Sequence, residues 1–242
     1  MLTRAFSRFR SDESGFSLVE LLTAMALGSI VLGAMLVLFV RGVTVSAQVN
    51  DRVEAAQRGR LAMDRVVTLL NSQTCLVNNA GLSTAPIVSG DANQVTFYAN
   101  LGKVDADPLL YQLRYDGTAK ALYEKQWVGT KDASANLTFP ASPSVSKQLA
   151  ANIVPTTAGA PIFQYWQFVT TAGPTLGAID PVPLGTGGTL GSTDLAKTVR
   201  VTAAFAAQPE RTKAQDLRST SIQGTATVGS ADPGEPMKGV NC

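Results

Sequence analysis

The stretch Gly15-Phe16-Ser17-Leu18-Val19-Glu20 decides the fold, because it opens a long apolar run that reaches Val40. Glu20 is the only ionisable side chain between Phe16 and Val40. At about 1.5 Å per residue, a helix over residues 16–40 is about 37 Å long, which is enough to cross a hydrocarbon layer of about 30 Å. The pattern predicts a membrane-spanning helix with one carboxylate. Because a charge at this depth costs about 2.5–3.5 kcal/mol on insertion scales, we expect Glu20 to have a partner or a function.

The leader before this run, residues 1–15, is short, polar and basic. Its charged residues are Arg4, Arg8, Arg10, Asp12 and Glu13. An ordinary secretory signal loses its apolar region on cleavage, whereas a cut after Gly15 would retain the apolar run. The positive charges also predict that the N-terminal end stays in the cytoplasm.

Together, these features resemble the N-terminus of type IV prepilins, a family that includes the pseudopilins of type II secretion. The family pattern is a basic leader ending in glycine, an aromatic residue, a glutamate at the fifth mature position and an apolar helix. Gly15, Phe16, Glu20 and the run to Val40 match it. The resemblance implies cleavage after Gly15 by prepilin peptidase and N-methylation of Phe16. The alternative is a plain single-pass anchor with an incidental glutamate.

The resemblance also implies assembly into a helical filament with other pilin or pseudopilin subunits, through the N-terminal helices and at an inner-membrane assembly platform. Cleavage would create a cationic α-amine on Phe16. Two unit charges about 4 Å apart attract by about 4 kcal/mol at an effective dielectric constant near 20. A salt bridge from this amine to Glu20 of an adjacent subunit would offset much of the cost of burying either charge. We therefore expect Glu20 to form the salt bridge of subunit assembly.

Beyond the membrane, the helix is predicted to continue to about residue 72. One apolar stripe recurs at spacings of three or four residues and predicts an amphipathic continuation packed on a sheet. Its members are Val49, Val53, Ala56, Met63, Val67 and Leu70. The expected organisation is a leader over 1–15, a transmembrane and filament-core helix over 16–40, an amphipathic continuation over 41–75 and a β-rich globular pilin domain over 76–242.

The globular part is predicted to form an antiparallel sheet, in one piece or two. Strand-like segments occur at 94–99, 110–115, 121–128, 162–169, 198–206 and 219–228. The dipeptide Asp116-Gly117 is typical of a hairpin turn. The expected fold class is α+β, with a long N-terminal helix packed on antiparallel sheet as in type IV pilins. The order of the segments is similar to that in the larger W-type minor pilins and J-type pseudopilins, which lie at or near the filament tip.

The chain contains two cysteines, Cys75 and Cys242. In an exported domain such a pair favours a disulfide over a metal site, because two thiolates without histidine do not complete a tetrahedral zinc site. The resemblance adds weight, since many pilins fasten a C-terminal segment with a disulfide. Two free thiols remain the alternative, and neither a metal nor a cofactor is expected.

Composition restricts the classes of function. The 20 basic and 18 acidic residues nearly balance, so no nucleic-acid partner is expected from bulk charge. The absence of histidine removes the commonest general base, and we do not expect an enzyme.

The sequence therefore predicts a structural subunit of a pilus or pseudopilus, of the minor, tip-proximal kind. The alternative is a binding module, an adhesin or DNA-uptake receptor, displayed on the same anchor. The expected location is the inner membrane, in contact with lipid, as a single-pass protein with a cytoplasmic N-terminus. The globular domain would then be extracytoplasmic, in the filament.

Overall fold

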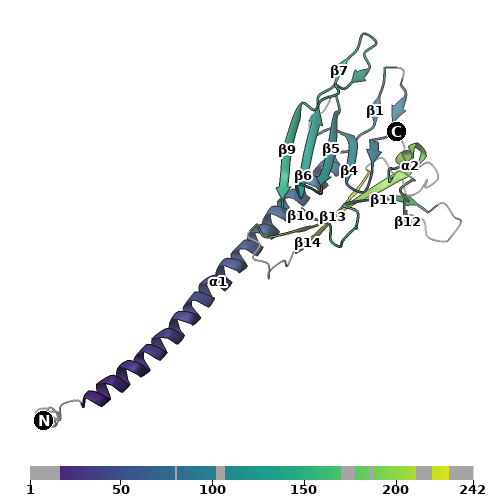
Figure 1. The fold of residues 1–242 in the computed structure, drawn as a ribbon. Helices are drawn as coiled ribbons and strands as arrows, with labels where there is room; N and C mark the ends of the chain where they lie inside the picture. The colour runs from purple at the N-terminus through teal and green to yellow at the C-terminus, as the bar shows by residue number, and fades with distance from the viewer. Residues whose placement is uncertain are drawn as a thin grey trace, which may run out of the picture. The chain divides into compact units, whose positions relative to one another are not determined.

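A single long helix dominates the N-terminal part of the computed structural model, which describes residues 17–79, 81–101, 107–169, 178–185, 188–210, 220–228 and 242. The chain divides into two units, Met1–Val49 and Asn50–Cys242. Helix α1 (Leu18–Asn71) contributes residues to both (Figure 1). The predicted helix, from about residue 17 to about residue 72, is confirmed.

The second unit contains two five-stranded antiparallel sheets, so the prediction of an antiparallel sheet in one piece or two is confirmed. The first sheet has the order β3-β4-β5-β6-β9. Its strands are β3 (Ile87–Gly90), β4 (Gln94–Ala99), β5 (Leu109–Asp116), β6 (Ala121–Trp127) and β9 (Val145–Ala151). In the register of the β5–β6 hairpin, Asp116 pairs with Ala121 across the turn that Asp116-Gly117 predicted.

In the second sheet, the long strand β13 lies between its neighbours. One edge of β13 pairs with β14, and β10 and β11 also pair with β13, while β12 extends the sheet from β11. The strands are β10 (Ile153–Val154), β11 (Phe163–Phe168), β12 (Ile179–Pro181), β13 (Thr198–Ala207) and β14 (Thr220–Thr227). The remaining elements are two small hairpins and a short helix: β1 (Leu76–Val77) with β2 (Ser83–Thr84), β7 (Thr130–Lys131) with β8 (Leu137–Thr138), and α2 (Ser192–Lys197).

One hydrophobic core joins the C-terminal part of α1 to both sheets. The residues that α1 buries are Ala55, Gly59, Ala62, Met63, Val66, Leu69 and Leu70. The predicted apolar stripe was therefore wrong at its start, because Val49 and Val53 are 49% and 50% exposed. The small residues of the true buried face were not recognised as part of it.

The buried face of α1 contains small residues because the helix lies very close to the second sheet. A Cβ on Gly59 would lie 2.9 Å from the Cβ of Ala207 in β13, and a Cβ on Gly224 in β14 would lie 2.5 Å from the sulfur of Met63. Real Cβ atoms do not approach other atoms so closely, so a larger residue at either position would force its neighbours to move. Gly59 thus lowers the helix propensity of α1 but allows the helix to pack closely on β13.

A charged pair also connects α1 to the first sheet. The Arg65 guanidinium donates two hydrogen bonds to the Glu124 carboxylate of β6, from Nε to Oε2 at 2.9 Å and from Nη2 to Oε1 at 2.6 Å. The Glu124 side chain is 7% exposed and that of Arg65 is 38% exposed. The hydrogen bond to Glu124 raises the pKa of Arg65 above its ordinary value. The pair is bidentate and fixes the helix against the sheet at this point.

Candidate assembly and membrane site

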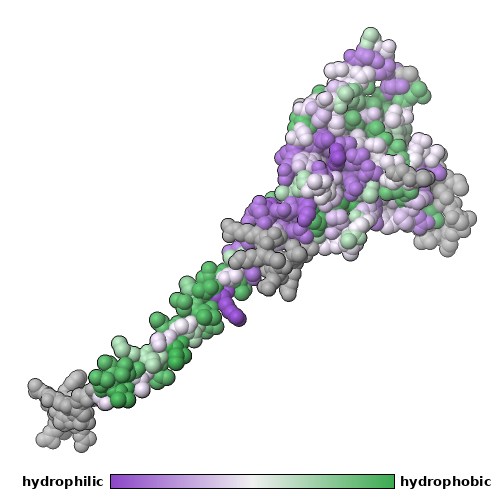
Figure 2. Space-filling model, in the orientation of Figure 1, coloured by the Kyte–Doolittle hydropathy of each residue, from purple (hydrophilic) through white to green (hydrophobic). Residues whose placement is uncertain are grey.

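The candidate functional site is the N-terminal part of α1, residues 18–49. No residue of this segment is buried, and Leu38 and Phe39 are 70% and 72% exposed. Figure 2 shows that apolar side chains cover most of this helix. The described part of the chain holds one helix that is long and apolar enough to cross a membrane. An exposed apolar surface of this extent calls for lipid or other protein chains around it.

Three hydroxyl side chains within the segment are satisfied by the helix itself. Hydroxyl groups donate to carbonyl oxygens three or four residues earlier: Thr23 to Glu20 at 3.0 Å, Ser29 to Ala26 at 2.8 Å and Thr44 to Val40 at 2.8 Å. Such hydrogen bonds leave these hydroxyl groups paired even when no water is present. The segment is therefore compatible with a hydrocarbon environment apart from its charges.

Glu20 lies in the first turn of α1. A carboxylate at a helix N-terminus interacts favourably with the helix dipole, by about 0.3–1 kcal/mol at exposed positions. No salt bridge of Glu20 occurs among the described residues, and its side chain is exposed. The predicted cleavage and methylation positions, Gly15 and Phe16, lie outside the described residues. The salt bridge of Glu20 with a neighbouring amine stays a prediction.

A second charge in the segment was overlooked at the sequence level. Arg41 directly follows the apolar run and is exposed, and apolar residues resume after it at Val43 and Val45. The signal that could have singled it out is its spacing from Glu20, which is close to one hydrocarbon thickness along a helix.

The structure joins Cys75 and Cys242 as a disulfide with a Cα–Cα distance of 5.8 Å. The hydroxyl of Ser83 donates to the carbonyl oxygen of Cys242 at 2.8 Å, so residue 242 is also held by the β1–β2 hairpin. The bridge connects the segment that follows α1 to a residue 167 positions later. Its role is to restrain the second unit.

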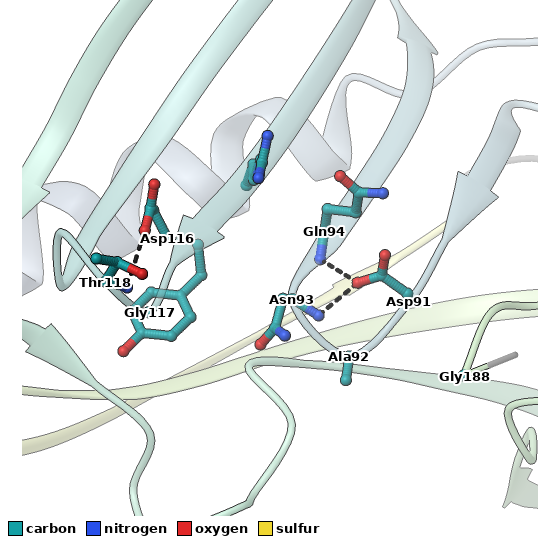
Figure 3. Close-up of a pocket in the computed structure, with 10 residues that line it drawn as sticks. Asp91, Ala92, Asn93, Gln94, Asp116, Gly117, Thr118 and Gly188 are labelled. Atoms are coloured by element: carbon teal, nitrogen blue, oxygen red, sulfur yellow. Dashed lines mark hydrogen bonds between the residues drawn. The ribbon is translucent and has the colours of Figure 1, made fainter.

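A polar cleft of about 580 Å³ lies between the β3–β4 and β5–β6 turns (Figure 3). The carboxylate of Asp91 accepts hydrogen bonds from the N–H groups of Asn93 and Gln94, at 2.7 and 2.9 Å. Asp116 likewise accepts from Thr118 and Ala119. The hydrogen bond from Ala119, followed by that from Thr118, lowers the pKa of Asp116. Both carboxylates thus serve to hold turns.

The β3–β4 turn is anchored from the second sheet. The Tyr165 hydroxyl donates to the carbonyl oxygens of Asp91 and Gln94, at 3.0 and 2.7 Å. Burial raises the pKa of Tyr165 well above its ordinary value. Among the described residues, no group of three or more histidine, cysteine or acidic side chains could hold a metal ion.

Comparison with known proteins supports the N-terminal site. Residues 10–36 match the family described as the prokaryotic N-terminal methylation motif. This match includes Gly15, Phe16 and Glu20 and continues into the exposed part of α1. A search of curated proteins finds no match to the chain. With a methylation motif at the head of a long helix that packs on antiparallel sheets, the chain is similar to type IV prepilin-like proteins. The motif implies processing by prepilin peptidase and assembly with other pilins.

Proposed function

We propose that this protein is a minor, assembly-initiating subunit of a type IV pilus or of a type II secretion pseudopilus. Prepilin peptidase cleaves it after Gly15, and Phe16 becomes the methylated first residue. The observation that carries the proposal is the combination of the methylation motif at 10–36 with an apolar helix that buries no residue over 18–49. The second unit has a core of its own, whereas residues 18–49 expose their apolar side chains.

In this proposal, α1 exchanges lipid for the helices of neighbouring subunits during assembly. Both surroundings are apolar, so the transfer itself changes the hydrophobic free energy little. The specificity then rests on charge. The α-amine of Phe16 would meet Glu20 of an adjacent subunit, because neither charge is stable alone in an apolar filament core. The protein starts as a single-pass inner-membrane protein with its N-terminus in the cytoplasm.

A tip-proximal position is supported by the size of the second unit, which holds two five-stranded sheets where contact with the helix needs one face. The order of the strand-like segments along the sequence also resembles that in W-type minor pilins and J-type pseudopilins. The second candidate function is a displayed binding module for adhesion or DNA uptake, and the polar cleft in Figure 3 is the observation that favours it. The near balance of charge argues against DNA as its ligand.

N-terminal sequencing and intact-mass measurement of the protein recovered from cells test the proposal. We expect the chain to begin at a methylated Phe16. A chain that still begins at Met1, or one cut after the apolar run, contradicts it. Deletion of the gene should then lower the number of filaments or the secreted yield at least tenfold, while overexpression should not thicken or lengthen filaments as a major subunit would. Normal filaments with lost DNA uptake or adhesion would favour the second candidate.

A further inference from the structure

The two charges of the exposed helix lie one membrane thickness apart. Glu20 and Arg41 are separated by 21 positions, which is about 31 Å along an α-helix, and a bilayer hydrocarbon core is about 30 Å thick. The residues between them carry no charge. When Glu20 is at one boundary of the hydrocarbon layer, Arg41 is therefore at the other.

Arg41 has no anionic partner within the described residues. No salt bridge or hydrogen bond there involves its side chain, which is exposed. The next acidic residue along the helix, Asp51, is ten positions away, which is about 15 Å. The nearby hydroxyl of Thr44 donates to the carbonyl of Val40 and is turned to the backbone. Within the described residues, no acidic side chain is therefore placed to pair with this guanidinium.

The apolar surface alone does not define where the membrane ends. Val43 and Val45 are 55% and 57% exposed and extend the apolar surface past Arg41. Arg41 itself is exposed, so its side chain can turn along the helix. Without the charge, the helix could sink by about one turn. The charge of Arg41 therefore determines which of these two depths the helix takes in the membrane.

We propose that Arg41 binds the phosphate of a phospholipid head group at the membrane face away from Glu20, and thereby fixes the depth of α1. The inference rests on the membrane anchor of the proposed function. A guanidinium presents paired N–H donors that match phosphate oxygens, and its long apolar stem lets it reach the head-group level. The match of the Glu20–Arg41 spacing to the hydrocarbon thickness favours lipid over a second copy of the chain as the partner.

The test uses the full chain in phosphatidylglycerol–phosphatidylcholine vesicles, with a nitroxide on Ser46→Cys. The native cysteines are joined as a disulfide and do not take the label. Depth is read from the ratio of accessibilities to oxygen and to a water-soluble nickel complex. We expect Arg41→Leu to move the label inward by about 5 Å, one helical turn. Arg41→Lys should move it by less than half as much, and Arg60→Leu, an exposed arginine in the second unit, should not move it.

Vesicles without lipid phosphate distinguish a phospholipid head group from free phosphate as the ligand of Arg41. In vesicles of a phosphate-free glycolipid, the unchanged chain should show the same inward shift as Arg41→Leu, and added inorganic phosphate should not reverse it. Unchanged depth in Arg41→Leu overturns the inference. A depth that varies with the protein-to-lipid ratio also overturns it, since the partner is then a second copy.

A nitroxide label on Ser29→Cys tests separately whether α1 spans the bilayer at all. Strong accessibility to the nickel complex at residue 29 shows that α1 does not span the bilayer, which overturns both the anchor and the role of Arg41. A protected label at residue 29, with no shift at residue 46, overturns only the role of Arg41.

Discussion

The two parts of helix α1 have opposite surfaces although they belong to one continuous helix. Residues 18–49 are apolar all round and bury nothing, whereas residues 50–71 bury small residues such as Ala55, Gly59 and Ala62 and expose charges. A helix that is hydrophobic on every side belongs in lipid or among other helices, and an amphipathic one belongs on its own domain. The first part of α1 therefore depends on lipid or on other protein chains around it.

Carboxylates follow the same division. In the second unit, Glu124 is paired with Arg65 and Asp116 is held by its own turn. In the first unit, Glu20 has no salt bridge among the described residues. Glu124 and Asp116 are thus satisfied within the second unit, so a substitution of either should act on stability. A substitution of Glu20 should act on assembly.

The largest effect is expected from Glu20→Gln, which keeps the side chain's shape and removes its charge. We expect incorporation into filaments to fall at least tenfold, because in the proposed assembly the α-amine of a neighbouring subunit would lose its counter-charge. The thermal unfolding of the second unit should not change. Immunoblotting of sheared filaments against whole cells measures the first quantity, and circular dichroism in detergent the second.

Glu54→Gln is the matched control, since Glu54 is on the same helix and its side chain is 64% exposed, 4.0 Å from Arg58. It should assemble normally, because exposed pairs of this kind contribute about 0–1 kcal/mol. If Glu20→Gln assembled as well as Glu54→Gln, a charge in the first part of α1 would matter no more for assembly than one in the second part.

Reduction of the disulfide should have the next largest effect, and only on the second unit. Opening a bridge between residues 167 positions apart lowers the free energy of unfolding by about 5 kcal/mol in the chain-entropy treatment. Chemical unfolding with and without reductant, followed by tryptophan fluorescence, measures the change. A Cys75→Ser, Cys242→Ser double variant should be insensitive to reductant. If the oxidised chain and this variant unfold at the same denaturant concentration, the bridge does not stabilise the unit.

Much of this architecture could be predicted from local sequence signals. The extent of α1 follows from a long run without proline, and β4 follows from the alternation over Gln94–Ala99, whose Val95 and Phe97 are fully buried. Glu20 could be singled out because a lone acid in an apolar run is rare. Its position needs no knowledge of the globular part.

Other features depend on contacts between residues far apart in the sequence. Strand β9 begins with four exposed residues and lacks a clear alternation, so its backbone pairing with β6 is what reveals it. Glu124 resembles a solvated strand residue until Arg65, from α1, is placed against it. Arg41 directly follows the apolar run, so in the sequence it looks like the end of the membrane-spanning segment. The structure shows that the exposed apolar surface continues beyond it, at Val43 and Val45.

The Arg65–Glu124 pair should respond asymmetrically to substitution. Arg65→Leu leaves the buried Glu124 carboxylate without its partner, and we expect the free energy of unfolding to fall by about 3 kcal/mol. Glu124→Leu leaves an arginine whose side chain already reaches water, so a loss of about 1 kcal/mol is expected. Denaturant unfolding of both single variants and of the double variant measures the coupling. Equal losses in the two single variants would contradict the burial difference on which this prediction rests.

The smallest effect is expected when the same substitution, glycine to alanine, is made in each part of α1. Gly59→Ala adds a Cβ 2.9 Å from that of Ala207, so the helix must move from β13 and we expect a loss of about 1–3 kcal/mol in the free energy of unfolding. Gly42→Ala adds a Cβ with nothing within 4 Å and should stabilise the helix slightly.

Thermal unfolding in detergent separates the two variants, because helix propensity favours alanine equally at both positions. A loss of stability that occurs only in Gly59→Ala therefore reports the packing of α1 on β13. If Gly59→Ala were as stable as Gly42→Ala, residues 50–71 would not be held against the sheet through this contact. The two parts of α1 would then differ in charge but not in how closely they are packed.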